Sequence, residues 1–201
     1  MIRMGMRRGG RVGVVLGVLA SLLLSLGVTA PATSATFDRT LELLGVVFHV
    51  TCANNSSVNE LRIVPSGLEV DNAPIARTIE GTVAGAESAD LNGDGSPEIY
   101  VFITSAGSGS YGSLVAYAAN RRRSLSEVYL PPVTQDVEAS RGYQGHDEFA
   151  VAGDALVRRF PVYRAGDTNA GPTGGTRQLE YWLMRGEAGW ILELVRSPEL
   201  R

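Results

Sequence analysis

Residues 178–195 read QLEYWLMRGEAGWILELV and predict a β-hairpin. Leu179, Tyr181 and Leu183 alternate with Gln178, Glu180 and Trp182. This two-residue period is that of a strand that buries one face. Residues 186–189 supply turn chemistry, and the return segment is apolar at most positions. We therefore expect two antiparallel strands, residues 178–185 and 190–195.

The same pattern recurs along most of the chain. Short segments rich in β-branched and aromatic residues are separated by Gly, Pro, Asn and Ser clusters, and no segment shows a long amphipathic helix. The expected strands are residues 37–51, 60–64, 75–84, 98–105, 113–117, 128–130, 148–151, 156–163, 178–185 and 190–195. This pattern predicts an all-β fold, a single-domain antiparallel β-sandwich or flattened barrel of about eight strands.

Composition agrees with one globular domain. The chain has 201 residues, of which 44% are hydrophobic and 19% are charged, and its mean hydropathy is +0.05. These values exclude disorder, collagen and a coiled coil. The single Cys52 cannot form an internal disulfide, and its apolar neighbours predict a buried strand residue rather than a reactive thiol.

The first 35 residues have the three parts of a secretory signal peptide. Four arginines lie in the first 11 positions, an apolar stretch follows at residues 12–28, and small residues fill positions 30–35. We expect cleavage after Ala35, which leaves a mature domain of residues 36–201 that is periplasmic or secreted. The alternative is a retained membrane anchor, because the apolar stretch is near the lower length limit for spanning a membrane.

Charge narrows the class of partner. Removal of residues 1–35 would leave 14 arginines against 21 acidic residues, a net charge of −7. Such a protein lacks the excess cations that release counterions from nucleic acid, so we expect no nucleic-acid partner. It would instead attract a basic protein. We expect no membrane contact in the mature form.

The densest chemical signal is a Gly- and Ser-rich loop that follows the apolar run of residues 99–103. The loop contains Gly107, Ser108, Gly109, Ser110, Tyr111 and Gly112. Its glycines match the dinucleotide-binding spacing G-x-G-x-x-G, but that site requires a βαβ context, which the surrounding sequence lacks. The lysine of a P-loop and the first glycine of a G-x-S-x-G nucleophile elbow are also missing.

This composition suits a narrow projecting finger. The glycines relax the backbone restrictions, and Ser108 and Tyr111 place two hydroxyl groups near the tip. Such a finger could enter a cleft whose floor carries carboxylates. The alternative is an ordinary hairpin loop whose tyrosine packs down against the domain.

Residues 90–95 resemble the opening of a calcium loop. Asp90, Asn92 and Asp94 supply oxygen ligands at alternate positions, and Gly95 allows a sharp turn. The twelfth position, where an EF-hand needs a glutamate, is Val101, so an EF-hand is excluded. A tight acidic turn is the alternative, and we assign no metal or cofactor.

Two further clusters have a functional and a plainer interpretation. His146 stands beside Asp147 and Glu148, so a metal or general-base role is conceivable, and Ser108 or Ser110 with His146 and Asp147 would make a small hydrolase site. A loop imidazole paired with a neighbouring carboxylate is the simpler interpretation. Residues 121–123 are all arginine, which predicts a solvated surface turn, with a site for an anionic ligand as the alternative.

Four stretches together resemble the periplasmic inhibitors of invertebrate-type (i-type) lysozyme, bacterial proteins that protect the peptidoglycan of their producers from animal lysozymes. The stretches are residues 90–98, 105–119, 142–149 and 158–163, and the resemblance extends over nearly all of the mature chain. In that family a Ser-Gly-x-Tyr loop inserts into the active-site cleft of lysozyme. The matching positions here are Ser108 and Tyr111.

The resemblance implies a β-sandwich-like inhibitor without enzymatic activity or cofactor, with an i-type lysozyme as partner and a homodimer as one form. Lysozyme chemistry needs two acidic groups beside the sugar bond. A tyrosine that fills the cleft and hydroxyls that donate to those groups would block the substrate. The alternative function is a calcium-dependent adhesion or carbohydrate-binding module, which would be retained on polysaccharide.

Overall fold

The described part of the chain is built from β-strands. The structure, a computed structural model, describes residues 35–196 and 199–200. These residues form thirteen strands and one 3-10 turn at Val133–Gln135, without an α-helix. The predicted all-β class is therefore confirmed.

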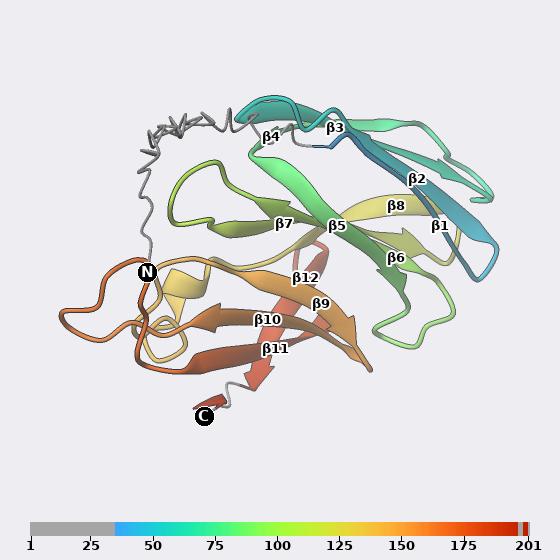
Figure 1. The fold of residues 1–201 in the computed structure, drawn as a ribbon. Coiled ribbons are helices and arrows are strands. Elements are labelled where there is room, and N and C mark those ends of the chain that lie inside the picture. Colours follow the sequence, from blue (N-terminus) through green and yellow to red (C-terminus); the bar gives the residue numbers. More distant parts are fainter. Residues whose placement is uncertain (1–34, 197–198, 201) are drawn as a thin grey trace, which may run out of the picture. The chain divides into compact units, whose positions relative to one another are not determined.

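The first sheet has four antiparallel strands in sequential order. They are β1 (Phe37–Leu43), β2 (Val46–Cys52), β3 (Val58–Ser66) and β4 (Ile75–Glu80), which lie side by side in Figure 1. The segment expected as a single strand at residues 37–51 is a hairpin, because Leu44 and Gly45 both have positive φ angles and form its turn. Cys52 is buried at the end of β2, as expected.

The second sheet holds the remaining nine strands. Its path runs β5-β6-β7-β8-β12-β11-β10-β9, and β13 pairs with β11. The strands are β5 (Thr82–Ala89), β6 (Glu98–Thr104), β7 (Gly112–Asn120), β8 (Ser124–Tyr129), β9 (Glu148–Ala152), β10 (Ala155–Pro161), β11 (Thr176–Arg185), β12 (Trp190–Arg196) and β13 (Glu199–Leu200). The predicted C-terminal hairpin is confirmed as β11 and β12.

This sheet curls into a nearly closed barrel. A flattened barrel was one of the two predicted architectures. The edge strands β5 and β9 meet where the backbone N–H of Val151 donates to the Glu87 carboxylate at 2.9 Å. One pairing departs from the expected antiparallel arrangement, because β8 and β12 run parallel. The eight strands of the path agree with the predicted number, and the four-stranded sheet is additional.

Gly81 separates the two sheets. The segment expected as one strand at residues 75–84 is divided here into β4 and β5, which belong to different sheets. Gly81 has a φ of +127°, and a Cβ at this position would collide with the Thr104 carbonyl oxygen. Only glycine fits this close crossing.

Strand β6 is buried on both faces. Ile99, Val101 and Ile103 belong to the core between the two sheets, whereas Tyr100 and Phe102 belong to the core inside the barrel. A continuous apolar run is the pattern of a strand covered on both sides. The Gly- and Ser-rich loop therefore leaves from one of the most deeply buried strands.

The expected signal peptide, residues 1–35, lies outside the described residues apart from Ala35. The described residues belong to one compact unit, Thr33–Arg201. No helix in the described part of the chain is long and apolar enough to cross a membrane.

Candidate functional site

The loop between β6 and β7 is closed by its own backbone. The N–H of Ser105 donates to the carbonyl oxygen of Tyr111 at 2.9 Å, and the N–H of Tyr111 donates back to the Ser105 hydroxyl at 2.9 Å. Within this closure, the N–H of Ser110 donates to the Gly107 carbonyl oxygen at 3.2 Å. The exposed tip consists of Ala106, Gly107 and Ser108.

Tyr111 is half exposed, and its ring packs against Tyr143 and Gly109. Its side chain is large and apolar, yet the residue keeps 50% of its surface accessible. The ring lies edge-on to the ring of Tyr143, with 5.8 Å between the centroids. It also lies directly over Gly109, where a Cβ would collide with the ring. The phenol is thus neither freely projecting nor folded beneath its neighbours.

The three glycines of the loop have different roles. We expected all of them to relax the backbone, but only Gly107, with φ +140°, occupies a conformation that favours glycine. Gly109 makes room for the Tyr111 ring. Gly112 makes room for Asp147, because a Cβ there would stand 2.5 Å from the Asp147 Cβ. Ser110 takes a positive φ of 42° without being glycine.

A buried carboxylate holds the end of the loop. The side chain of Asp147 is 0% exposed. Its Oδ2 accepts the N–H of Gly112 at 2.7 Å and the hydroxyl of Tyr143 at 2.7 Å, and its Oδ1 accepts Nε of Arg158 at 2.6 Å. A carboxylate with three donors, one of them the cation Arg158, satisfies most of its hydrogen-bonding capacity while buried.

Arg158 and Tyr143 complete this network. Nη2 of Arg158 donates to the Tyr143 hydroxyl at 2.8 Å, and the guanidinium lies 5.1 Å from the Tyr143 ring centroid. Burial opposes the charge of Arg158, but its hydrogen bond to Asp147 raises the pKa of the guanidinium. Burial, followed by the hydrogen bond to Asp147, raises the pKa of Tyr143. The arginine therefore stays charged and the phenol stays neutral.

A second set of contacts holds the middle of the loop. The backbone N–H of His146 donates to the Gly109 carbonyl oxygen at 2.7 Å. The side chain of Asn169 donates to the Ser108 carbonyl oxygen at 2.8 Å, and its Oδ1 lies 3.1 Å from Nε2 of His146. The Gly112 end and the middle of the loop are therefore fixed by residues far away in the sequence.

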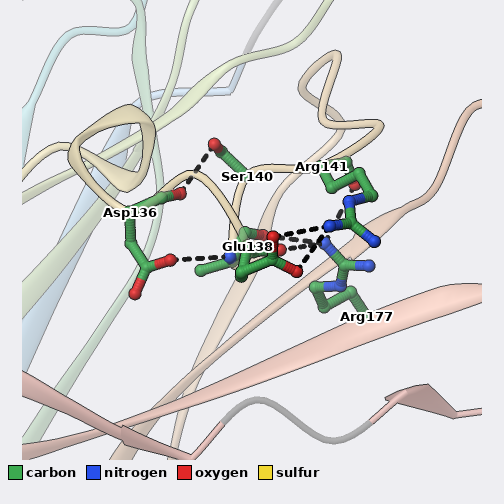
Figure 2. Close-up of polar contacts among 6 residues, drawn as sticks. Asp136, Glu138, Ser140, Arg141 and Arg177 are labelled. Carbon is green, nitrogen blue, oxygen red and sulfur yellow. Dashed lines mark hydrogen bonds and ion pairs between the residues drawn. The ribbon is translucent and has the colours of Figure 1, made fainter.

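The segment before Tyr143 is a single capped turn. The Asp136 carboxylate accepts the N–H of Ala139 at 2.9 Å. At the other end, Nη1 of the buried Arg177 donates to the carbonyl oxygens of Glu138, Ala139 and Arg141 at 2.8, 3.1 and 2.9 Å. Figure 2 shows Asp136 and Arg177 on opposite sides of this turn. A cation at such a carboxyl-terminal end satisfies orphan carbonyl groups.

The hydrolase alternative is not assembled. The imidazole of His146 is within hydrogen-bonding distance of Asn169, and Asp147 is paired with Arg158 rather than with the imidazole. The hydroxyl of Ser110 donates to the Gly107 carbonyl oxygen at 3.5 Å. Asp147, which sequence reasoning placed in a hypothetical catalytic role, instead supports the loop.

The residues of the possible calcium loop form contacts with one another. The Asp90 carboxylate accepts the N–H groups of Asp94 and Gly95 at 3.0 and 2.9 Å, and the Asn92 side chain accepts the N–H of Asp94 at 3.0 Å. This is the geometry of a tight acidic turn. In the described ranges, no group of three or more His, Cys, Asp or Glu side chains could hold a metal ion.

Sequence reasoning did not assign a role to Tyr143, Arg158 or Asn169. Tyr143 and Arg158 lie within two of the stretches that carry the family resemblance, which was a signal of their importance. Nothing local pointed to Asn169, because its contact with Ser108 joins residues 61 positions apart.

The comparison with protein families covers the loop itself. The family described as PliI, "Periplasmic lysozyme inhibitor of I-type lysozyme", matches residues 70–139, a narrower range than the resemblance suggested. The other two comparisons found no matching curated protein and no matching solved structure. Over residues 70–139, the chain is therefore similar to the family of periplasmic inhibitors of I-type lysozyme, which is a family of inhibitors and not of enzymes.

Proposed function

We propose that the protein inhibits an i-type lysozyme by inserting residues 105–112 into the active-site cleft. The match of residues 70–139 to the inhibitor family supports the inhibitor activity and its target. The observation that supports insertion is Tyr111, a half-exposed aromatic residue on a loop fixed by the Asp147 network. A large aromatic side chain held in place is the usual anchor of a protein interface.

The chemistry of the loop suits a cleft that contains two carboxyl groups. Residues 105–112 include no acidic side chain, so the loop would enter without like-charge repulsion. The Tyr111 phenol and the exposed Ser108 hydroxyl would donate hydrogen bonds to those carboxyl groups. Because the loop is already ordered, binding would lose little conformational entropy.

The decisive experiment compares two equally exposed tyrosines. Tyr111→Ala should raise the inhibition constant against an i-type lysozyme by roughly 30- to 1000-fold, since losing an interface anchor costs about 2–4 kcal/mol. The matched control is Tyr129→Ala, because Tyr129 is 53% exposed but lies on β8, outside the loop. The control should inhibit like wild type. Equal inhibition by wild type and Tyr111→Ala would remove the loop from the mechanism.

Ser108 contributes a smaller effect. Ser108→Ala removes one hydroxyl donor and should weaken inhibition by about 1–2 kcal/mol. The backbone carbonyl of Ser108 would still accept the hydrogen bond from Asn169, so the loop should keep its conformation. A hen-type lysozyme, assayed in parallel, should remain active if the cleft contacts are specific for the i-type enzyme.

The cellular location and the oligomeric state of the protein are also open to test. The description of the matching family as periplasmic supports a periplasmic inhibitor. Release from the cell and protection of peptidoglycan from animal lysozymes are further proposals. We also propose that the protein forms a homodimer, which light scattering of residues 36–201 tests. A monomer mass at inhibitory concentrations would contradict the dimer without affecting the loop mechanism.

A further inference from the structure

A hollow of about 520 Å³ lies between the β7–β8 turn and the strands β11 and β12. Its walls include Arg121, Arg123 and Arg185, together with Trp190 and Asp94. None of the loop residues 105–112 lines it. A volume in this range is typical of a small-molecule site and is larger than a bare inorganic anion requires.

The three guanidinium groups have no acidic partner within residues 35–196. Arg121 and Arg123 make no side-chain hydrogen bond or ion pair there, and Arg185 lies 4.6 Å from the ring centroid of Trp190. The Trp190 indole N–H donates to Asn120 at 3.1 Å, which fixes the ring. With Asp94 as the only carboxylate among the lining residues, the hollow carries a net charge of +2 in an acidic protein.

The turn that carries two of these arginines is strained. The N–H of Arg123 donates to the Asn120 carbonyl oxygen at 3.0 Å, and the two central residues, Arg121 and Arg122, have φ angles of 50° and 53°. Asn and Gly are the favoured residues in this type I′ turn. Arginine is a costly choice there, and strained residues are concentrated at functional sites.

A neighbouring hollow of about 550 Å³ provides an aromatic surface. It shares Asp94, Arg185 and Trp190 with the first hollow and adds Trp182 and Asp154, so that the two hollows together carry a net charge of +1. Trp182 is 51% exposed and points outward from β11. A half-exposed indole beside a cationic hollow offers an apolar face for a ring that carries an anion.

We propose that these two joined hollows bind a phosphorylated saccharide. The phosphate, with up to two negative charges, would accept hydrogen bonds from Arg121, Arg123 and Arg185, which line the more cationic of the two hollows. Guanidinium groups bind phosphate oxygens in a bidentate geometry. The sugar ring would lie against Trp182. A soluble sugar phosphate and the headgroup of a phosphorylated glycolipid share this chemistry, and the site is separate from the lysozyme-binding loop.

Calorimetric titration with glucose 6-phosphate, inorganic phosphate and glucose tests the proposal at constant ionic strength. Glucose 6-phosphate should bind more tightly than inorganic phosphate, and glucose should not bind. Arg123→Gln and Arg185→Gln should each weaken glucose 6-phosphate binding by about tenfold or more. Trp182→Ala should reduce its affinity to that of inorganic phosphate.

Arg122→Gln is the matched control. Arg122 has the same charge and lies in the same turn, but it does not line the hollow, and its Nη1 donates to the Leu44 carbonyl oxygen at 3.1 Å. This variant should bind like wild type. An equal loss in Arg122→Gln and Arg123→Gln would show a general charge effect and overturn the proposal, as would equal binding of glucose and glucose 6-phosphate.

Two arms distinguish the sources of the ligand. Phosphatidylcholine vesicles with and without lipid A test the glycolipid headgroup. Vesicle binding that is lost in Arg123→Gln would identify a glycolipid, whereas binding of glucose 6-phosphate alone would identify a soluble sugar phosphate. Inhibition of lysozyme should be unchanged in Arg123→Gln and Arg185→Gln, so the failure of this site and the failure of the loop mechanism can be told apart.

Discussion

Gly109 and Gly145 show how single positions set the conformation of Tyr111. The Tyr111 ring covers Gly109, and Gly145 lies against both this ring and the Gly109 carbonyl oxygen. Any side chain at either glycine would occupy space that the loop now fills. At the residue scale, the loop therefore depends on the absence of two Cβ atoms.

This close packing predicts the effect of Gly145→Ala. The new Cβ would collide with the Gly109 carbonyl oxygen, and φ at this position is +95°. We expect a loss of stability of about 1–3 kcal/mol and an inhibition constant raised by roughly tenfold. Thermal unfolding and lysozyme inhibition measure the two effects.

Gly153→Ala is the control for backbone strain. Gly153 has a φ of +60°, but no atom lies within 4 Å of a Cβ built there. This variant should lose stability and keep full inhibition. A comparable loss of inhibition in both variants would argue against a local effect on the loop.

At the scale of elements, the loop is fixed by residues from two other parts of the barrel. Asp147 immediately precedes β9, and Arg158 lies on β10, yet both act on the first residue of β7 through the Gly112 N–H. A hairpin loop with three glycines would be mobile on its own. Here the neighbouring strands hold it in one conformation, which favours rapid and tight association.

Asp147→Asn tests this support. The change leaves the buried Arg158 without an anionic partner, so we expect the free energy of unfolding to fall by about 3–5 kcal/mol. The folded protein should also inhibit more weakly, because the Gly112 N–H loses a charged acceptor.

Tyr143→Phe is the milder companion variant. It removes a single hydroxyl and should cost about 1–2 kcal/mol of stability. The ring that contacts Tyr111 stays, so inhibition should remain close to that of wild type.

If the Asp147→Asn variant is folded and inhibits lysozyme as strongly as wild type, Asp147 only stabilises the fold and does not support inhibition.

At the scale of the whole molecule, stability depends on a buried acid. Glu98, which begins β6, is 1% exposed, and burial raises its pKa to about 8. The folded protein therefore binds this proton more tightly than the unfolded chain, whose exposed carboxyl has the ordinary glutamate pKa of 4.5. The contribution of Glu98 to stability is complete below that pH and is lost as the pH rises towards about 8.

Urea unfolding at several pH values checks this dependence. The wild-type free energy of unfolding should fall by on the order of a few kcal/mol between pH 4.5 and pH 8. Glu98→Gln should flatten the curve over this range. Glu187→Gln changes an exposed carboxyl in the β11–β12 turn and should keep the wild-type dependence. A wild-type curve that rises over the same range would contradict the assignment.

Local sequence patterns were enough to identify the all-β class, most of the strand segments, the C-terminal hairpin and the position of the Gly- and Ser-rich loop. Alternation of apolar residues and turn clusters act over a few neighbouring residues, so they can be recognised without the fold. They did not reveal that Gly81 passes the chain from one sheet to the other. That role depends on a crossing with Thr104, which lies far away in the sequence.

The contacts that hold the loop of Tyr111 in place also depend on the tertiary structure. Ser108 and Tyr111 were predicted from residues in a row. Asp147, Arg158 and Asn169 reach the loop only because the sheet curls into a barrel, which brings segments near β9 and β10 to the start of β7. Contacts between distant segments leave no periodic trace in a single sequence. The physical reason is that packing and buried charge pairing depend on neighbours in space, not on neighbours along the chain.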